Sequence, residues 1–438
     1  MARAAVLKTL RRYGTSDAST LLAANLAVAS TALVTGVVTA RTLGPAGRGD
    51  FAILVFWPAL AAVVLDIAVR ESVTLRVASG RILTGTAVAT GLVLASGCSL
   101  FAGSLVYLAL PWLLRTSQQH LLWASRGFLL FIPAMLFSEV LVGGLLGLGL
   151  FGRVASVRIT AAMLYTGTVL VLAGSRLLTP VRLAYATLGM TAIPIVLGVP
   201  MLLRHIRGSI RIERHNLVDQ ATLGVKLQST RAASLLSSFE ERGIAAMMFS
   251  QTDVGLFQIP IAATWMLSFI GQALSQLLFA RIAPLSGADR SALVSRIHRT
   301  TLALTTTGAV IAAVGAPFLI SRLYGPGFAP ATGPTMIVCV ASIFAGSSLV
   351  LQNASKAAEK IWWPIGAEVV AMLASATFAL LLCRRWPLMG LAAAYSAGRL
   401  TSYGVSLYGA RRVVSVTPAG LGSGRREVDT DASATDSL

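Results

Sequence analysis

A few charged side chains lie inside stretches that are otherwise apolar, and their types and places are the ones most suited to chemistry. Glu139 is in one such stretch, Glu240, Glu241 and Arg242 are adjacent in a second, and Arg399 is near the centre of a third. A charge near the middle of a bilayer costs about 2.5–3.5 kcal/mol on insertion scales, so each needs a partner or a wet cavity. A buried carboxylate can exchange protons, and a buried guanidinium can hold a phosphate through paired hydrogen bonds.

Arg399 is the best candidate for contacting a phosphate, because its guanidinium offers two donors in a low-dielectric site. The alternative for Arg399 is a structural ion pair with Glu139 or Glu368. Glu139 is expected either to face a cavity and carry protons, or to pair with a buried arginine such as Arg399 as a fixed strut. The adjacent Glu240, Glu241 and Arg242 cannot all point the same way on a helix, so at least one is expected to face the cavity and the others to form ion pairs with another helix.

Neutral polar residues form two stripes at helical spacing. The stripes are Thr31, Thr35 and Thr39, and Ser268, Gln272 and Gln276. Such stripes can line a sugar-binding cavity, or they can join packed helices at about 0.6 kcal/mol for each contact. Two further charges, Arg158 and Glu368, fall in the first turns of apolar stretches, where reaching the polar interface explains both.

The apolar stretches that must position these residues make up most of the chain. Its 438 residues are 55% hydrophobic and only 12% charged, which excludes an ordinary soluble enzyme. Because a bilayer span needs about 20 apolar residues, the sequence predicts an all-α integral membrane protein of about twelve transmembrane helices, six in each half. The predicted spans are 21–40, 51–69, 82–110, 127–150, 154–173, 183–203, 226–250, 254–280, 300–321, 330–352, 362–383 and 388–408.

Lysine and arginine are distributed unevenly between alternate loops. The loops on the side of both termini hold 25 of the 36, and those on the opposite side hold 9. The positive-inside rule therefore predicts a multi-pass protein of the cytoplasmic (inner) membrane with both termini in the cytoplasm. The formal charge of +19 follows from this topology, so we expect no nucleic-acid partner.

A basic segment divides the apolar stretches into two halves. We expect an N-terminal six-helix lobe (1–203), a cytoplasmic basic linker (204–225), a C-terminal six-helix lobe (226–410) and a disordered cytoplasmic tail (411–438). The linker arginines are Arg204, Arg207, Arg211 and Arg214. Their spacing favours one face of a helix lying on the membrane surface, and an ordinary basic loop is the alternative.

The sequence carries no signature of a metal, cofactor or catalytic centre. Cys98, Cys339 and Cys383 are isolated in apolar segments, and the four histidines are scattered through polar ones. These spacings suit neither a disulfide framework nor a metal site. We therefore expect a protein that is not an enzyme and that needs no cofactor.

A short motif occurs once in each half. Gly49-x-Phe51-x-Ile53 follows the first predicted span, and Gly255-x-Phe257-x-Ile259 follows the seventh, 206 residues later. Both copies lie in the turn between the first two helices of their half and face the same side. The halves are therefore predicted to be parallel repeats, related by an axis along the membrane normal.

Three motifs carry a family resemblance. They are Leu43-Gly-Pro-x-Gly-x-Gly-x-Phe51, Glu241-Arg242 ahead of Val254-Gly-Leu-Phe257, and Leu323-Tyr-Gly-Pro-Gly-Phe-Ala-Pro-Ala331. With the six-plus-six layout they resemble the oligosaccharide flippases of polysaccharide biosynthesis (Wzx-like), in the multidrug/oligosaccharidyl-lipid/polysaccharide (MOP) exporter superfamily. The resemblance covers about residues 10–410. The chain departs from the family pattern in having Glu241 where aspartate is usual and phenylalanine where the turns often have tyrosine.

The resemblance implies two lobes that form a V around a central cavity open alternately to either side. The implied cargo is a polyprenyl-pyrophosphate-linked oligosaccharide, with membrane lipids and a polysaccharide polymerase or assembly proteins as partners. The cavity candidates are Arg399, Glu139, Glu241, Arg242, Gln272 and Gln276. A multidrug exporter of the same fold is the first alternative. A membrane glycosyltransferase or ligase is a weaker one, because all predicted external loops are short.

The topology can be tested by cysteine labelling in intact cells. Cysteines at Ser209 and Ser286 are expected to resist an impermeant thiol reagent, because both positions lie on the predicted cytoplasmic side. A cysteine at Ser117 is expected to react. The opposite pattern would reverse the orientation of the protein and the direction of transport.

Overall fold

The computed structural model describes residues 2–80, 82–206, 212–229, 232–282, 287–357 and 360–415, and their regular structure is entirely helical. Helices suit a bilayer because they satisfy every backbone donor and acceptor within one segment. The first-half helices are α1 (Ala2–Val64), α2 (Val69–Ser79), α3 (Thr84–Leu113), η1 (Thr116–Leu121), α4 (Leu122–Phe128), α5 (Phe131–Gly147), α6 (Phe151–Gly174) and α7 (Pro180–Leu203). The remaining helices are α8 (Arg214–Ser229), α9 (Ala232–Met248), α10 (Gln251–Ile282), α11 (Gly287–Tyr324), η2 (Pro326–Ala331), α12 (Thr332–Ala357), α13 (Trp362–Leu382) and α14 (Pro387–Ser415).

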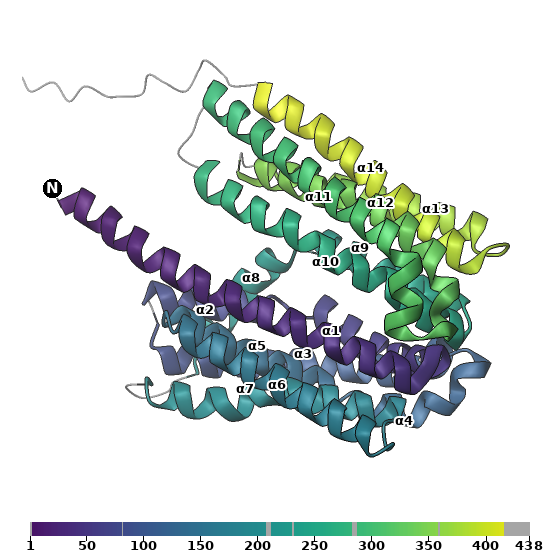
Figure 1. Ribbon diagram of the computed structural model, residues 1–438. Helices are drawn as coiled ribbons and strands as arrows, with labels where there is room; N and C mark the ends of the chain where they lie inside the picture. The colour runs from purple at the N-terminus through teal and green to yellow at the C-terminus, as the bar shows by residue number, and fades with distance from the viewer. Residues whose placement is uncertain are drawn as a thin grey trace, which may run out of the picture.

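The prediction of an all-helical integral membrane protein is confirmed. Eleven of the twelve predicted spans coincide largely with a helix, the first two of them with the two parts of α1. The span predicted at 226–250 begins in the last turn of α8 and otherwise corresponds to α9. Within the described residues, eight helical segments are long and apolar enough to cross a membrane. Figure 1 shows α1–α7 gathered in one group and α10–α14 in a second group beside it.

The bend in α1 separates the first two spans. Gly44 has φ 67° and ψ −178°, a conformation that glycine adopts without the steric cost of a side chain. Pro45 follows it and cannot donate a backbone hydrogen bond. The Leu-Gly-Pro motif of the sequence is therefore a turn between two membrane helices, as predicted.

Two expected boundaries differ from the helix ends. α8 continues to Ser229, so the linker boundary placed at 225 falls inside a helix. α14 continues to Ser415, past the expected start of the tail at 411, and residues 416–438 lie outside the described part of the chain. Arg207 and Arg211 also lie outside it, so the arginine face of the linker stays a prediction.

The linker helix α8 packs on the first group of helices. Arg76 on α2 forms an ion pair with Asp219 at 2.5 Å, and Gln228 donates to the Val63 carbonyl oxygen at 3.0 Å. Gly224 makes this close packing possible, since a Cβ there would lie 2.2 Å from the Ile67 carbonyl oxygen. We call the end of the bundle that carries α8 the linker end, and the opposite end, with the α1 bend and the α9–α10 turn, the turn end.

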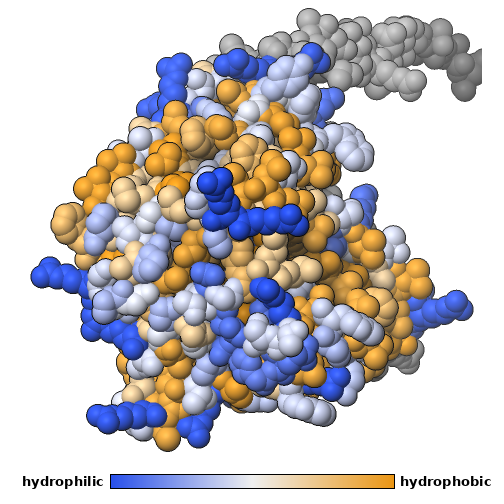
Figure 2. Space-filling model, turned by 90° about the vertical axis from the view of Figure 1, so that its right-hand side faces the viewer, coloured by the Kyte–Doolittle hydropathy of each residue, from blue (hydrophilic) through white to orange (hydrophobic). Residues whose placement is uncertain are grey.

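The two copies of the repeated motif touch each other at the turn end. A Cβ on Gly49 would lie 1.7 Å from the Gln251 carbonyl oxygen, and a Cβ on Gly255 would lie 1.8 Å from the Pro45 carbonyl oxygen and 2.9 Å from the Gly49 nitrogen. The glycines therefore let the backbones of α1 and α10 meet. Figure 2, which faces this end, shows hydrophilic side chains standing out from a largely hydrophobic surface.

A small apolar core surrounds this crossing. It joins Ala40 of α1 to Ile259 of α10, Ile320 of α11 and Phe328 of η2, and all four are buried. Phe328 comes from the third motif of the family resemblance. The motifs of the sequence thus hold the two halves together at one end.

Gly255→Ala is expected to destabilise the protein, because its methyl group would overlap backbone atoms of Pro45. Overpacking of this kind costs about 1–3 kcal/mol. Gly103→Ala is the matched control, since no atom lies within 4 Å of its added Cβ. Thermal unfolding of the purified proteins should show a lower Tm for Gly255→Ala alone. Equal values of Tm would contradict the close crossing.

Candidate functional site

Helices of the second half line a cavity of about 470 Å³. Its walls come from α9, α10, α12, α13 and α14, and every lining residue lies between Ser234 and Ser402. All of its walls lie in the second half, so this cavity differs from the V-shaped cavity that was expected between the halves. Its polar lining residues are Ser234, Ser238, Glu241, Arg242, Thr264, Ser268, Gln272, Ser342, Ser348, Gln352, Lys356, Glu368, Tyr395, Arg399 and Ser402.

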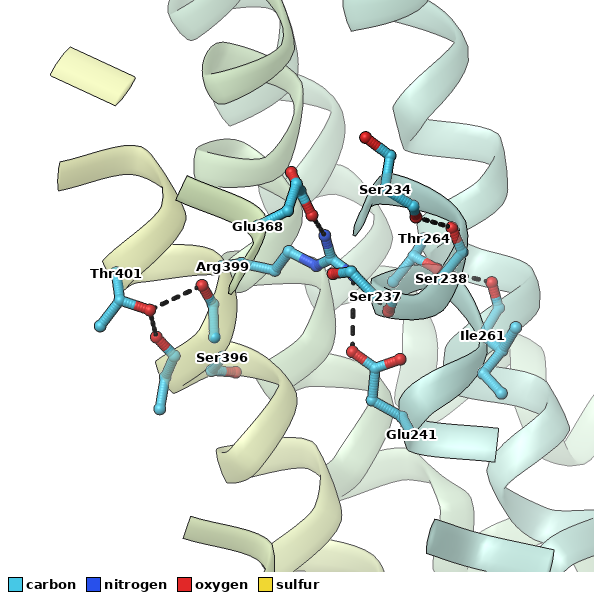
Figure 3. A network of polar contacts seen from close by, with 12 residues as sticks. Ser234, Ser237, Ser238, Glu241, Ile261, Thr264, Glu368, Ser396, Arg399 and Thr401 are labelled. Atoms are coloured by element: carbon cyan, nitrogen blue, oxygen red, sulfur yellow. Dashed lines mark hydrogen bonds and ion pairs between the residues drawn. The ribbon is translucent and has the colours of Figure 1, made fainter. Parts of the chain in front are cut away.

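An arginine between two carboxylates dominates the cavity wall. Arg399 of α14 reaches Glu241 of α9 at 3.4 Å and Glu368 of α13 at 3.8 Å, each through a different terminal nitrogen (Figure 3). It also donates to the Ser237 carbonyl oxygen at 3.4 Å. The side chains of Glu241 and Glu368 are only 8% and 9% exposed. Ion pairing lowers the cost of holding these charges away from water.

Neutral groups complete the network around this triad. Gln352 of α12 donates to Glu368 at 2.7 Å and lies 3.3 Å from the Ser402 hydroxyl. The Tyr395 ring lies 5.0 Å from the Arg399 guanidinium carbon. The triad and Gln352 together therefore link four helices, α9, α12, α13 and α14, through polar contacts.

Two more cations line the cavity. Arg242 lies over the rings of Phe239 and Trp265, at 5.8 Å and 5.6 Å from their centroids. Such stacking holds a guanidinium without neutralising its charge. Lys356 lines the cavity from the linker end of α12. The lining thus contains the cations Arg242, Lys356 and Arg399 against the two carboxylates of the triad.

Most of the predicted cavity residues lie together. Arg399, Glu241, Arg242 and Gln272 all line this cavity, and Gln272 reaches the Ser268 hydroxyl at 3.2 Å. The side chain of Gln276 lies outside the described residues. Of the two predicted stripes, Ser268 and Gln272 face the cavity, whereas Thr31, Thr35 and Thr39 bond to carbonyl oxygens of their own helix.

Glu139 lies elsewhere, in the first half of the chain. It forms an ion pair with Arg70 of α2 at 3.0 Å, and Arg70 also contacts Glu71 at 2.9 Å. Glu139 therefore pairs with an arginine, as one of the two hypotheses held, but Arg399 is the wrong partner and Arg70 takes its place. The reason is that α2 packs directly on α5, which carries Glu139, and brings Arg70 to it.

Of the two expectations for Glu368, the ion pair with Arg399 is confirmed and the place at the polar interface is wrong. Its place in the first turns of α13 suggested a side chain that reaches the polar interface, but it is buried against Gln352 and Arg399. A glutamate side chain is too short to reach the polar interface from inside a span. The length of the side chain could therefore have predicted from the sequence that Glu368 is buried. Sequence reasoning missed three further lining residues, Gln352, Lys356 and Ser402. Nothing in the sequence marks them as functional, because a single polar residue near a helix end is common.

No protein-family model matches the sequence, and no curated protein matches it either. Solved structures match it along most of its length. One is an inward-facing multidrug resistance MATE family transporter of the MOP superfamily (TM-score 0.72, 14% identity, 87% of this chain and 94% of that chain). Another is the lipid II flippase MurJ in an inward closed conformation (TM-score 0.73, 12% identity, 89% of this chain and 86% of that chain).

The chain has the fold of MOP superfamily transporters. An outward-facing MATE structure is less similar to it, with a TM-score of 0.57 at 12% identity over 89% of this chain and 95% of that chain.

The two ionic clusters are expected to respond differently to removal of one partner. Arg399→Ala leaves two buried carboxylates without their cation and should cost about 3–5 kcal/mol. Glu139→Gln should cost less than about 1 kcal/mol, because Arg70 keeps Glu71 and both partners are about a quarter exposed or more. Thermal unfolding measures both. A larger loss for Glu139→Gln would reverse this assignment of the structural charges.

Proposed function

We propose that the protein is a flippase for polyprenyl-pyrophosphate-linked oligosaccharides in the cytoplasmic membrane. It moves its cargo from the cytoplasmic to the outer leaflet by alternating access, for the synthesis of cell-surface polysaccharide. The observation that carries this proposal is the excess of cations over carboxylates on the cavity wall, among many hydroxyl and amide groups. The MurJ and MATE structures support a carrier of this fold, and both are named as transporters or flippases.

The pyrophosphate is the part of the cargo that this charge balance favours. Arg242 has aromatic neighbours and Arg399 shares its charge between two carboxylates, so Arg242 and Lys356 offer the more available positive charge. Guanidinium groups bind phosphate oxygens with pairs of hydrogen bonds. Arg399 lines the same cavity and adds a third cation.

The sugars match the neutral part of the wall. Ser268 and Gln272 on α10 and Ser342 on α12 present hydroxyl and amide groups, which donate and accept hydrogen bonds as sugar hydroxyls do. A volume of about 470 Å³ is in the range that encloses a compound of a few rings. A pyrophosphate with one or two sugars is of this size.

A multidrug exporter of the same fold is the second candidate, and one observation favours it. Glu241, Glu368 and the Trp265 ring lie on one cavity wall, and carboxylates and aromatic faces both attract organic cations. The three lining cations oppose such a cargo. A glycosyltransferase or ligase is the weaker alternative, because the predicted external loops are short. Polysaccharide polymerases or assembly proteins are the expected neighbours in the membrane.

Binding by the purified protein in lipid nanodiscs discriminates between the two cargo classes. A polyprenyl-pyrophosphate oligosaccharide should bind, and an excess of a cationic dye should not displace it. Arg399→Lys keeps the charge but loses the paired donors, so it should weaken binding about tenfold while the protein stays folded.

Arg126→Lys is the matched control, because Arg126 stacks on Tyr107 and Trp123 away from the cavity. It should bind as the wild type does. Tighter binding of the dye than of the lipid-linked sugar would favour the exporter. Unchanged binding in Arg399→Lys would exclude Arg399 from the cargo site.

A further inference from the structure

Side chains of the first half cap helix ends of the second half at the turn end. Arg41 of α1 donates through Nε to the Leu323 carbonyl oxygen at 2.8 Å and also contacts the Arg322 carbonyl oxygen. Both carbonyls belong to the last turn of α11. These contacts join residues more than 280 positions apart in the sequence.

A second arginine repeats this arrangement on another helix. Arg115, just before η1, donates to the Met248 carbonyl oxygen at 2.7 Å, and Gln118 of η1 donates to the Ala246 carbonyl oxygen at 3.0 Å. Both carbonyls belong to the last turn of α9. Gln251 of α10 returns the contact by donating to the Ser117 carbonyl oxygen at 2.7 Å.

The chemistry of a helix end explains why arginines fit there. The last four carbonyls of an α-helix have no partner within the helix, and the helix dipole makes this end partly negative. A guanidinium supplies several donors and a positive charge to both features. Each cap exists only while the two halves are in contact at the turn end, because the arginine and the helix belong to different halves.

We propose that Arg41 and Arg115 form an external latch that holds the turn end closed while the cavity is accessible from the linker end. The inference rests on alternating access as proposed above and adds the residues that set its resting state. The comparison with solved MATE structures supports this proposal. The TM-score is 0.72 for the inward-facing structure and 0.57 for the outward-facing one. When the turn end opens, Arg41 and Arg115 move away from the carbonyl oxygens of α11 and α9, and water takes over these hydrogen bonds.

The glycine crossing has a separate part in the same closure. Gly49 and Gly255 bring α1 and α10 into backbone contact beside the two caps. Backbone contact supplies the close fit, whereas the arginines supply hydrogen bonds that water can replace. The latch is therefore reversible, and its strength depends on the two side chains.

Distance measurements between spin labels test the latch without any cargo. Labels on cysteines at Leu177 and Arg384, both exposed at the turn end of opposite halves, are placed in a chain in which Cys98, Cys339 and Cys383 are replaced. In lipid nanodiscs the wild type should show one short main distance. Arg41→Gln and Arg115→Gln should each raise the ratio of the longer to the shorter distance about tenfold, the value of one hydrogen bond to a charged group.

Arg126→Gln is the control, because this arginine lies in the same half as its partners Tyr107 and Trp123. It should leave the distances unchanged. A single short distance in Arg41→Gln and Arg115→Gln would overturn the latch, even where the lipid-linked sugar still binds. An equal change in Arg126→Gln would also overturn it. Loss of cargo binding with the expected distances would instead count against the proposed cargo and leave the latch standing.

Discussion

The cavity wall depends on the ion triad of Arg399 with Glu241 and Glu368. Charges inside an apolar bundle are tolerable only when they are paired and hydrogen-bonded, and here three helices each contribute one charged residue to the group. Gln352 ties a fourth helix to it. The triad carries more negative than positive charge, so the excess of cations on the cavity wall comes from Arg242 and Lys356, which line the same cavity.

The second constraint lies at the turn end. There the backbones of α1 and α10 meet at Gly49 and Gly255, and arginines of one half cap helices of the other. Among the described residues, Arg41, Arg115, Gln118 and Gln251 make polar contacts between the halves at this end. At the opposite end, α8 packs on the first half. A bundle joined firmly at one end can open at the other. An alternating-access carrier needs this arrangement, because in each of its states one end of the bundle is closed and the other is open.

Much of this organisation is predictable from sequence, and the limits have physical reasons. Hydropathy predicts the spans because backbone in lipid must be helical, and the cost of buried charge identifies Arg399, Glu241 and Arg242. Partners are set by helix packing, which composition does not reveal. Glu139 therefore meets Arg70 and not Arg399, and Glu368 is buried. The motif at Gly49 and Gly255 predicts a repeat, but only the structure shows that its two copies touch.

An experimental structure of the protein with a polyprenyl-pyrophosphate oligosaccharide tests the cation-rich cavity as a cargo site most directly. We expect both phosphates within hydrogen-bond distance of Arg242, Lys356 or Arg399, and the first sugar against the hydroxyl and amide groups of α10 and α12. A lipid-linked sugar bound outside the second half, with the triad unchanged and the cavity empty, would contradict this assignment.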